Sequence, residues 1–235
     1  MTHMIGRTTA LVGMAAACAL GLAIGATVPQ TKSEDAAFGK RVRAYILAHP
    51  EIIAEAAERL RIGPERTAIE TPFKGAIAGN PNGDVTLVMF SDYNCPYCRA
   101  TAPEIDRLLA ADPKLKVVWR EMPVLGPDSD AAAAAALAAA KQGKYLAFHR
   151  ALFSGNHPDQ NGVAAAAKAA GLDPGKFAAD RAAPDVQAEI TANLALARRL
   201  QIGATPFFVI GNRTFEGAIG HDALARAIAE ARQDD

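Results

Sequence analysis

The fold is decided by the stretch Phe90-Ser91-Asp92-Tyr93-Asn94-Cys95-Pro96-Tyr97-Cys98-Arg99, in which two cysteines stand three positions apart. The apolar run 85–90 predicts a buried strand, and residues 102–109 show helical periodicity. The two cysteines are therefore expected where a strand leads into a helix. Cys95 falls at the N-cap and Pro96 at the first helical position, which proline favours.

This placement gives Cys95 the environment of a reactive thiol. Unpaired N–H groups and the positive end of the helix dipole face a sulfur at a helix N-terminus, which favours thiolate over thiol. The thiolate is the form that attacks disulfides. Cys98 follows one turn later on the same face, so it can close a ring with Cys95. The spacing predicts a redox-active dithiol.

Two other interpretations of the cysteine pair are weaker. A structural zinc site wants four ligands, but no second such pair occurs, and His149, His157 and His221 are scattered singly. A purely structural disulfide across so short a loop would constrain the unfolded chain little.

Composition indicates one globular domain with an appendage. The chain has 235 residues, of which 50% are hydrophobic, enough for one sizeable core. Its 25 basic and 25 acidic residues balance, so we expect no basic face for nucleic acid. Of three cysteines, Cys18 lies in an apolar N-terminal segment. A lone pair, Cys95 and Cys98, in the remainder indicates chemistry rather than a disulfide scaffold.

Residues 1–28 are predicted to be a signal peptide or membrane anchor. Arg7 precedes the stretch 8–28, which contains no charged residue. Small residues at Ala23 and Gly25 are compatible with a cleavage site. The same stretch is long enough to cross a bilayer if it is not cleaved. Both outcomes stay open.

Residues 36–62 predict a short helical arm, broken by Pro50 into two helices. Its apolar positions form one stripe. Two interpretations stay open: the stripe packs on the main domain, or the arm joins several copies of the chain. The stripe consists of Val42, Tyr45, Ile46, His49, Ile52, Ile53, Ala56 and Leu60.

Residues 70–235 predict an α/β domain. The strand 85–90, the cysteine helix and a second strand at 115–121 form a β-α-β unit, which indicates parallel strands with a right-handed crossover. Residues 128–200 are almost wholly helical and are interpreted as an insertion. A last strand pair, turning at Gly211-Asn212, and a closing helix end the chain.

Taken together, three motifs resemble the DsbA family of thiol-disulfide oxidoreductases. They are the stretch 90–98, Glu121-Met122-Pro123-Val124-Leu125-Gly126, and Gly203-Ala204-Thr205-Pro206 before a strand pair. With the segment 45–53, the pattern is most similar to the ScsC-like branch of bacterial envelope proteins. The resemblance implies an α/β thioredoxin fold with a helical insertion, preceded by the leader and the arm.

The resemblance also implies roles for the residues of the cysteine motif. Cys95 matches the attacking cysteine and Cys98 the resolving one. Pro96 and Tyr97 match the dipeptide that tunes the redox potential. Neither a cofactor nor a metal site is implied.

Thr205-Pro206 matches the family's cis-proline, which faces the disulfide. A cis X-Pro bond is rare and tied to particular positions. Here it would turn the Thr205 backbone outward, so that an extended substrate peptide could pair with it. Without the cysteine motif upstream, an ordinary turn would be the better interpretation.

One position departs from the family pattern. Many relatives carry a buried acidic residue six positions before the attacking cysteine, where it relays protons. Met89 stands there in this chain. Glu121 and Asp92 are substitutes, although a solvated or structural carboxylate is the simpler interpretation of each. The route by which Cys98 loses its proton is the open question.

The predicted function is thiol-disulfide exchange on exported proteins, as an oxidase or an isomerase. We expect a protein of the bacterial cell envelope, in the periplasm after signal cleavage or tethered to the inner membrane. Its partners would be client proteins with thiols or disulfides and a membrane redox partner. The alternative is an envelope protein that binds copper(I) or another metal through Cys95 and Cys98.

Overall fold

The computed structural model describes residues 32–155 and 157–233. The predicted leader, residues 1–28, therefore lies outside the described residues. By its internal contacts the chain divides into two units, Met1–Pro50 and Glu51–Asp235. None of the helices within the described ranges combines the length and apolar character needed to cross a membrane.

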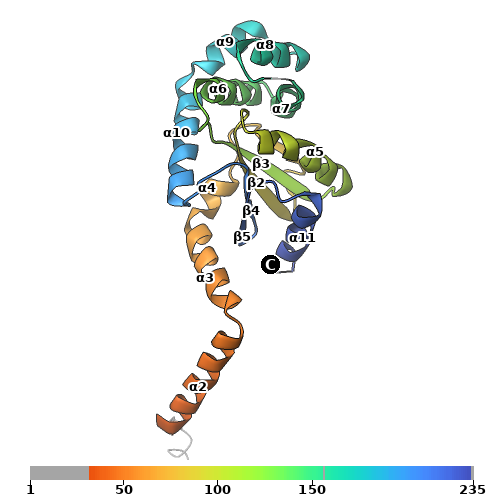
Figure 1. Ribbon diagram of the computed structural model, residues 1–235. Helices are drawn as coiled ribbons and strands as arrows, with labels where there is room; N and C mark the ends of the chain where they lie inside the picture. Colours follow the sequence, from red (N-terminus) through yellow and green to blue (C-terminus); the bar gives the residue numbers. More distant parts are fainter. Residues whose placement is uncertain (1–31, 156, 234–235) are drawn as a thin grey trace, which may run out of the picture. The chain divides into compact units, whose positions relative to one another are not determined.

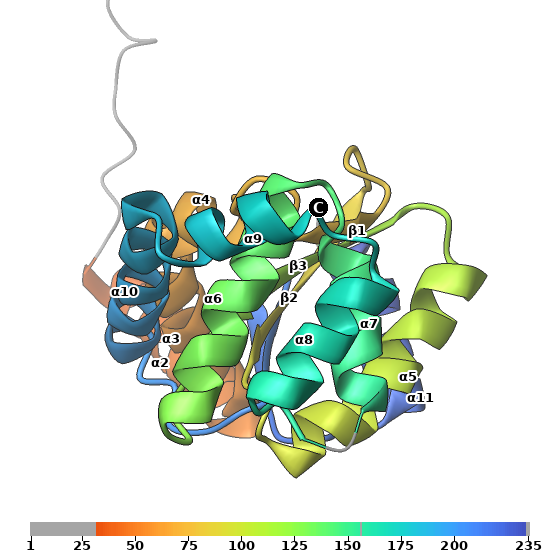
Figure 2. The same ribbon diagram turned by 90° about the horizontal axis from the view of Figure 1, so that it is seen from above.

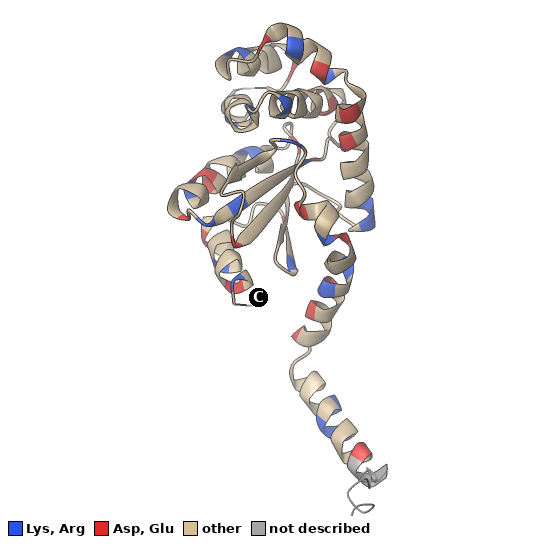
Figure 3. Cartoon of the chain, turned by 180° about the vertical axis from the view of Figure 1, so that it is seen from behind, with Lys and Arg blue, Asp and Glu red and all other residues tan. Residues whose placement is uncertain are grey.

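The N-terminal arm consists of two helices, as the position of Pro50 predicted. Helix α2 spans Lys32–Ala48 and belongs to the first unit, whereas α3 spans Glu51–Ile62 and begins the second. Figure 3 shows acidic and basic residues mixed along α3, where Arg59 pairs with Glu55 and Arg61 with Glu58.

A five-stranded sheet in the order β1-β3-β2-β4-β5 forms the centre of the second unit (Figure 1). β2 and β3 are parallel, as predicted, and the other neighbouring pairs are antiparallel. The β2–β3 register places Ser91 opposite Glu121 at the end of both strands. The strands are β1 (Ile77–Gly79), β2 (Val85–Ser91), β3 (Leu115–Glu121), β4 (Phe207–Ile210) and β5 (Arg213–Glu216).

The helical insertion runs between β3 and β4, as predicted. Ten of the residues of its first helix, α6, are buried, most of them alanines, whose small side chains allow neighbouring elements to approach closely. Figure 2 shows α6 and α7 lying across the sheet. The insertion comprises α6 (Pro127–Lys141), α7 (Tyr145–Ser154), α8 (Gln160–Ala169), α9 (Pro174–Arg181) and α10 (Pro184–Arg199).

Helices cover both faces of the sheet. Alternate residues of β2 and β3, such as Met89 and Trp119, pack on one face with helices α5, α6, α7 and α11. Val88, Phe90 and Val118 pack on the other face with the end of α3, with α4 and with α10. The remaining helices are η1 (Gly63–Glu65), α4 (Arg66–Glu70), α5 (Pro96–Ala111) and α11 (His221–Ala231). This architecture confirms the predicted α/β fold with a helical insertion.

Arg120 ties the second face together. Its guanidinium is buried and donates from Nε to the carbonyl of Ile69 in α4 at 3.0 Å. Nη1 donates to Glu189 at 2.9 Å and to Asn193 at 3.2 Å, both in α10. Nη2 donates to two further carbonyls at the end of the α4 segment, those of Ala68 and Thr71. One side chain of β3 thereby joins α4 to α10.

Candidate active site

The two cysteines lie where the sequence placed them. β2 ends at Ser91, and α5 begins at Pro96 with Cys95 as its N-cap residue, in an extended conformation. The Cys95 N–H donates to the carbonyl of Asp92 at 3.1 Å, which closes the turn between strand and helix. Both cysteines are free thiols; Cys95 is 4% exposed and Cys98 is fully buried.

Thr205 and Pro206 lie against the first thiol although 110 positions separate Thr205 from it. The Thr205–Pro206 peptide bond is cis, as the resemblance implied. The Cys95 Sγ–H donates to the Thr205 carbonyl at 3.1 Å. The fold therefore brings Cys95, Cys98, Thr205 and Pro206 to one edge of the sheet, where Tyr97 is 64% exposed.

Asp92 is a structural carboxylate, one of the two interpretations made from sequence. It is buried and accepts four hydrogen bonds. Oδ1 accepts from the Asn94 N–H at 2.8 Å and the Ser129 hydroxyl at 2.7 Å. Oδ2 accepts from the Val124 and Leu125 N–H groups at 2.8 and 3.0 Å. Asp92 thus fixes the cysteine turn against the loop after β3, whose Val124 and Leu125 side chains are exposed.

Glu121 is not a solvated carboxylate, because it is only 1% exposed. Its Oε1 accepts from the Tyr145 hydroxyl at 2.6 Å and, more weakly, from the Tyr93 hydroxyl at 3.5 Å. Its Oε2 is buried with no hydrogen-bond partner. Burial is the main cause that raises the pKa of Glu121 to about 8, opposed by the Tyr145 hydrogen bond.

His149 belongs to the same buried cluster. Its Nδ1 lies 2.9 Å from the Tyr93 hydroxyl oxygen, and its ring stacks on that of Tyr145. Burial, with a smaller effect from the charge of Arg150, lowers the pKa of His149 to about 3. The imidazole is therefore neutral at physiological pH. Sequence reasoning considered this histidine only as a metal ligand and missed the cluster.

Cys98 holds its proton firmly. Burial is the largest cause that raises its pKa to about 12, and the neighbouring Cys95 adds to it. The backbone at Asp92 and the side chains of Ser91 and Thr205 partly oppose this rise by favouring the thiolate. Any reaction of Cys98 as a nucleophile near neutral pH therefore requires a group that takes up its proton.

Sequence reasoning also missed Ser91. Its hydroxyl oxygen is buried without a hydrogen-bond partner of ordinary length, although it faces Cys98 closely enough to favour the thiolate. The signal was present in the sequence: Ser91 and Glu121 end two parallel strands, each at a position in phase with the buried residues before it.

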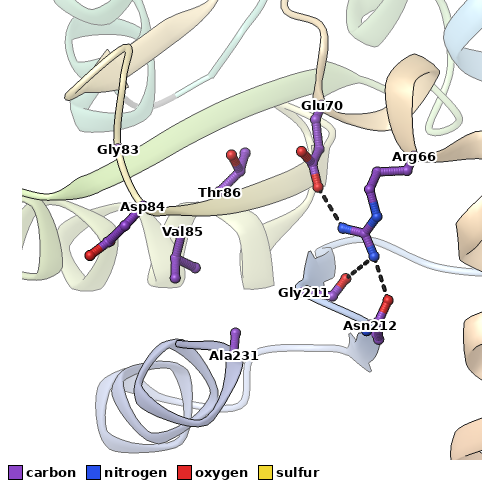
Figure 4. Close-up of a pocket in the computed structure, with 9 residues that line it drawn as sticks. All are labelled: Arg66, Glu70, Gly83, Asp84, Val85, Thr86, Gly211, Asn212 and Ala231. Atoms are coloured by element: carbon purple, nitrogen blue, oxygen red, sulfur yellow. Dashed lines mark hydrogen bonds and ion pairs between the residues drawn. The ribbon is translucent and has the colours of Figure 1, made fainter. Parts of the chain in front are cut away.

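A polar cavity of about 460 Å³ lies at the opposite end of β2 from the thiols (Figure 4). Figure 4 shows Arg66 bridging Glu70 and the β4–β5 turn, where it donates to the Gly211 carbonyl and the Asn212 side chain. These groups satisfy one another, so the cavity offers no reactive group.

No cluster of three or more His, Cys, Asp or Glu side chains suited to a metal ion occurs within residues 32–155 and 157–233.

Comparison with protein-family models finds two matches. Residues 86–229 match the DSBA-like thioredoxin domain. Residues 34–63 match the N-terminal domain of the copper resistance protein ScsC. The two matches together cover the arm, the cysteine motif, the insertion and the closing strand pair.

Solved structures of similar proteins agree with these matches. A thioredoxin-like oxidoreductase from Silicibacter pomeroyi DSS-3 is 45% identical, with a TM-score of 0.65 over 67% of this chain and 91% of that one. The thiol-disulfide exchange protein α-DsbA2 from Wolbachia pipientis is 29% identical, with a TM-score of 0.71 over 76% and 97%. The catalytic domain of Proteus mirabilis ScsC is 27% identical, with a TM-score of 0.68 over 74% and 98%.

Curated relatives of known sequence include the Na(+)/H(+) antiporter NhaA 3 of Salinispora tropica, which is 29% identical over 165 residues. That match takes in 68% of this chain but 25% of the antiporter. The chain thus spans about a quarter of the length of the curated relatives it matches.

Proposed function

Because the chain belongs to the family of DSBA-like thioredoxin domains, we propose that it is a thiol-disulfide oxidoreductase that acts on exported proteins through Cys95 and Cys98. One observation carries the proposal. Cys95 is the N-cap residue of helix α5, its sulfur lies 3.1 Å from the carbonyl of Thr205, the residue before a cis-proline, and Cys98 follows one turn later.

In the oxidising direction, a client thiolate attacks Cys95 of the Cys95–Cys98 disulfide. A mixed disulfide between client and Cys95 forms, and the Cys98 sulfur leaves with the electron pair. A second client thiolate then attacks the client sulfur of the mixed disulfide. The client gains a disulfide, and the protein is left with two reduced sulfurs. Each step exchanges one S–S bond for another.

Client proteins would bind at the edge of the sheet that holds Cys95 and Thr205. An extended client segment would pair with the backbone at Thr205, beside the reactive sulfur. The exposed side chains of Tyr97, Val124 and Leu125 supply apolar contacts there. Asp92 holds Val124 and Leu125 through their N–H groups, so this surface is fixed to the cysteine turn.

The substitution Cys98→Ala tests the proposal. Without the resolving sulfur, a reduced variant exposed to a peptide disulfide should accumulate a covalent mixed disulfide on Cys95, visible by mass spectrometry without reductant. Cys95→Ala is the matched control and should trap nothing. An absence of any adduct on Cys98→Ala would refute disulfide exchange.

The same variants address the alternative, copper(I) binding by the two thiols. The match of residues 34–63 to the N-terminal domain of the copper resistance protein ScsC is the observation that favours it. A copper(I) protein would lose the metal in both single variants and trap no peptide. Two soft thiolates suit copper(I), but no His, Asp or further Cys of the described residues forms a three-ligand group with them.

Helix α2 favours an isomerase over an oxidase. Phe38, Val42 and Tyr45 recur at helical spacing and are all exposed, Phe38 to 61% and Tyr45 to 60%. Such a stripe fits association between copies of the chain, which would bring several cysteine pairs to one misfolded client. An isomerase must be kept reduced, so an isomerase function requires a membrane electron donor.

Changing Phe38 and Tyr45 to Ser should lower the mass of the full chain measured by light scattering and weaken refolding of a scrambled substrate. Leu47 is also exposed, at 67%, but lies on the opposite side of α2, so Leu47→Ser is the matched control. A monomeric wild-type chain with a high reduction potential would instead support a dithiol oxidase.

A further inference from the structure

Two buried polar groups on the sheet face that holds the resolving thiol are left incompletely paired. Ser91 and Glu121 are partners in the β2–β3 register, and alternation along the strands puts them on the same face as Met89 and Trp119, which pack in one cluster with Cys98. Ser91 Oγ and Glu121 Oε2 both lack a hydrogen-bond partner. An unpaired buried polar atom costs free energy, and these two stand out among the unpaired atoms of the described residues because they are neighbours across two strands beside the cysteine motif.

From this juxtaposition we infer that Glu121 is the group that exchanges a proton with Cys98, with the Ser91 hydroxyl between them. The inference rests on the proposed disulfide exchange and assigns its proton transfer to this chain's own carboxyl. Met89, which stands six positions before Cys95, has no ionisable group and cannot take this part.

The geometry suits a short relay. Ser91 and Glu121 are paired in the β2–β3 register, and the backbones of neighbouring strands lie about 4.8 Å apart, so their side chains are neighbours on one face of the sheet. On its other side Ser91 faces Cys98 closely enough to favour the thiolate. A serine hydroxyl both accepts and donates, so it can pass a proton and return to its starting state.

The protons balance both when the Cys95–Cys98 disulfide forms and when it opens. When Cys98 resolves a mixed disulfide, its proton moves to the ionised Glu121, and its thiolate attacks Cys95. The Cys95–Cys98 bond forms as the Cys95–client bond breaks, and the client leaves as a thiolate. When a client thiolate opens the disulfide, Cys98 leaves as the thiolate and takes the proton back from Glu121. The carboxyl ends each cycle as it began.

The environment tunes Glu121 for this exchange. Burial raises its pKa to about 8, near the range in which a proton acceptor works best at neutral pH. The Tyr145 and Tyr93 hydroxyls stabilise the ionised form by hydrogen bonds, whereas the charges of Asp92 and Glu189 oppose it. His149, which completes the cluster, is neutral because burial lowers its pKa to about 3.

The test separates the two steps of the reaction. Reduced full-length protein is mixed with oxidised glutathione, quenched with acid at intervals, alkylated and weighed by mass spectrometry. The first step, attack by Cys95, gives the glutathione adduct. The second step, ring closure by Cys98, removes it. If no adduct forms in any variant, the proposed function fails; if only the second step is insensitive to Glu121, this inference fails.

Glu121→Gln should leave adduct formation within twofold of wild type and slow ring closure by about 100-fold at pH 8, the low end of the range for a lost proton acceptor. Wild-type closure should accelerate with pH and level off above about 8, as Glu121 ionises. The variant should show no plateau there, because closure then follows the Cys98 thiol, whose pKa is about 12.

Glu104→Gln is the matched control: it removes the same charge from α5, and its Oε2 is also buried and unpaired. It should close at the wild-type rate with the wild-type plateau. Should Glu121→Gln fail to fold, Tyr145→Phe gives the same information. Its missing hydrogen bond should move the plateau to higher pH, since that bond lowers the pKa of Glu121. A profile that neither variant alters would overturn the inference.

Discussion

Arg120 and Glu121 are consecutive residues of β3, both buried and both ionisable, yet they face opposite sides of the sheet. The Arg120 guanidinium reaches five acceptors from α4, α10 and the segment between α4 and β1. Glu121 has partners on one oxygen only. One buried charge is fully compensated, and its neighbour is not.

The difference separates a structural role from a chemical one. Burial lowers the pKa of Arg120, and the charge of Glu189 opposes that change, but a guanidinium keeps its proton at any physiological pH. Arg120 therefore acts as a fixed crosslink between helices and sheet. Glu121 can change its protonation near neutral pH, and it does so on the face that holds the resolving thiol. Incomplete pairing keeps that carboxyl available for a proton.

The largest expected effect is the pH dependence that Glu121 imposes on folding. Its pKa rises from 4.5 in the unfolded chain to about 8 in the folded one. Stability from this group is therefore complete below pH 4.5 and is lost as pH rises toward 8, because only the unfolded chain ionises freely. At about 1.4 kcal/mol per tenfold change in proton binding, the loss amounts to at most about 5 kcal/mol.

Urea unfolding of wild type and Glu121→Gln at pH 5 and pH 8 measures this loss. The free energy of unfolding of wild type should fall relative to the variant between the two values, since glutamine has no proton to release. Other titrating groups contribute equally to both proteins and cancel in the difference. Parallel pH dependences would contradict the comparison, because Glu121 would then behave as Arg120 does.

The second prediction concerns Arg120→Met, which should destabilise the fold by about 3–5 kcal/mol. The substitution leaves the half-buried Glu189 carboxylate and several carbonyls without their donor. The cost should differ less between pH 5 and pH 8 than the effect of Glu121 does, because the carbonyls that lose their donor do not titrate. Arg59→Met, which breaks an exposed ion pair with Glu55, is the control and should cost less than about 1 kcal/mol.

Removing Glu189 together with Arg120 tests whether the two side chains act as a pair. In the double variant Arg120→Met, Glu189→Leu, the uncompensated carboxylate is gone, so part of the lost stability should return. A double variant as unstable as the sum of its single changes would mean that Arg120 and Glu189 act independently, against the contacts between them.

The sequence predicted what depends on neighbouring residues in the chain. The strand 115–121 contained both Arg120 and Glu121, and alternation places them on opposite faces. The N-cap position of Cys95 and the break at Pro50 also followed from local signals, and the structure confirms them. The cis-proline beside Cys95 was expected only through the family resemblance, because 110 positions separate Thr205 from Cys95.

Those local patterns could not predict which side chains contact Arg120 and Glu121. Tyr145 and Glu189 come from the helical insertion, whose packing depends on how an alanine-rich segment folds back over the sheet. Without the partners, a buried glutamate could not be told from a solvated one. The leader at 1–28 lies outside the described residues, and the limits 36–62 and 70–235, with the insertion at 128–200, stay predictions.

The smallest expected effect is that of Glu189, on one face of the sheet, on the titration of Glu121, on the other face. Glu189 pairs with Arg120 on one side of the sheet, and its charge also raises the pKa of Glu121 on the other. Glu189→Gln keeps an oxygen for Arg120 but removes the charge. The plateau of ring closure should then move to lower pH, by less than Tyr145→Phe moves it upward, because the Tyr145 hydrogen bond is the stronger influence.

The glutathione assay at a series of pH values measures both movements. Opposite displacements in Glu189→Gln and Tyr145→Phe would follow only if the titrating group lies between α7 and α10, where Glu121 stands. Two displacements in the same direction would point to a change in Cys98 itself, because a general loosening of the site would expose the thiol and lower its pKa in both variants. The sign of a small displacement therefore discriminates between a proton relay and mere packing.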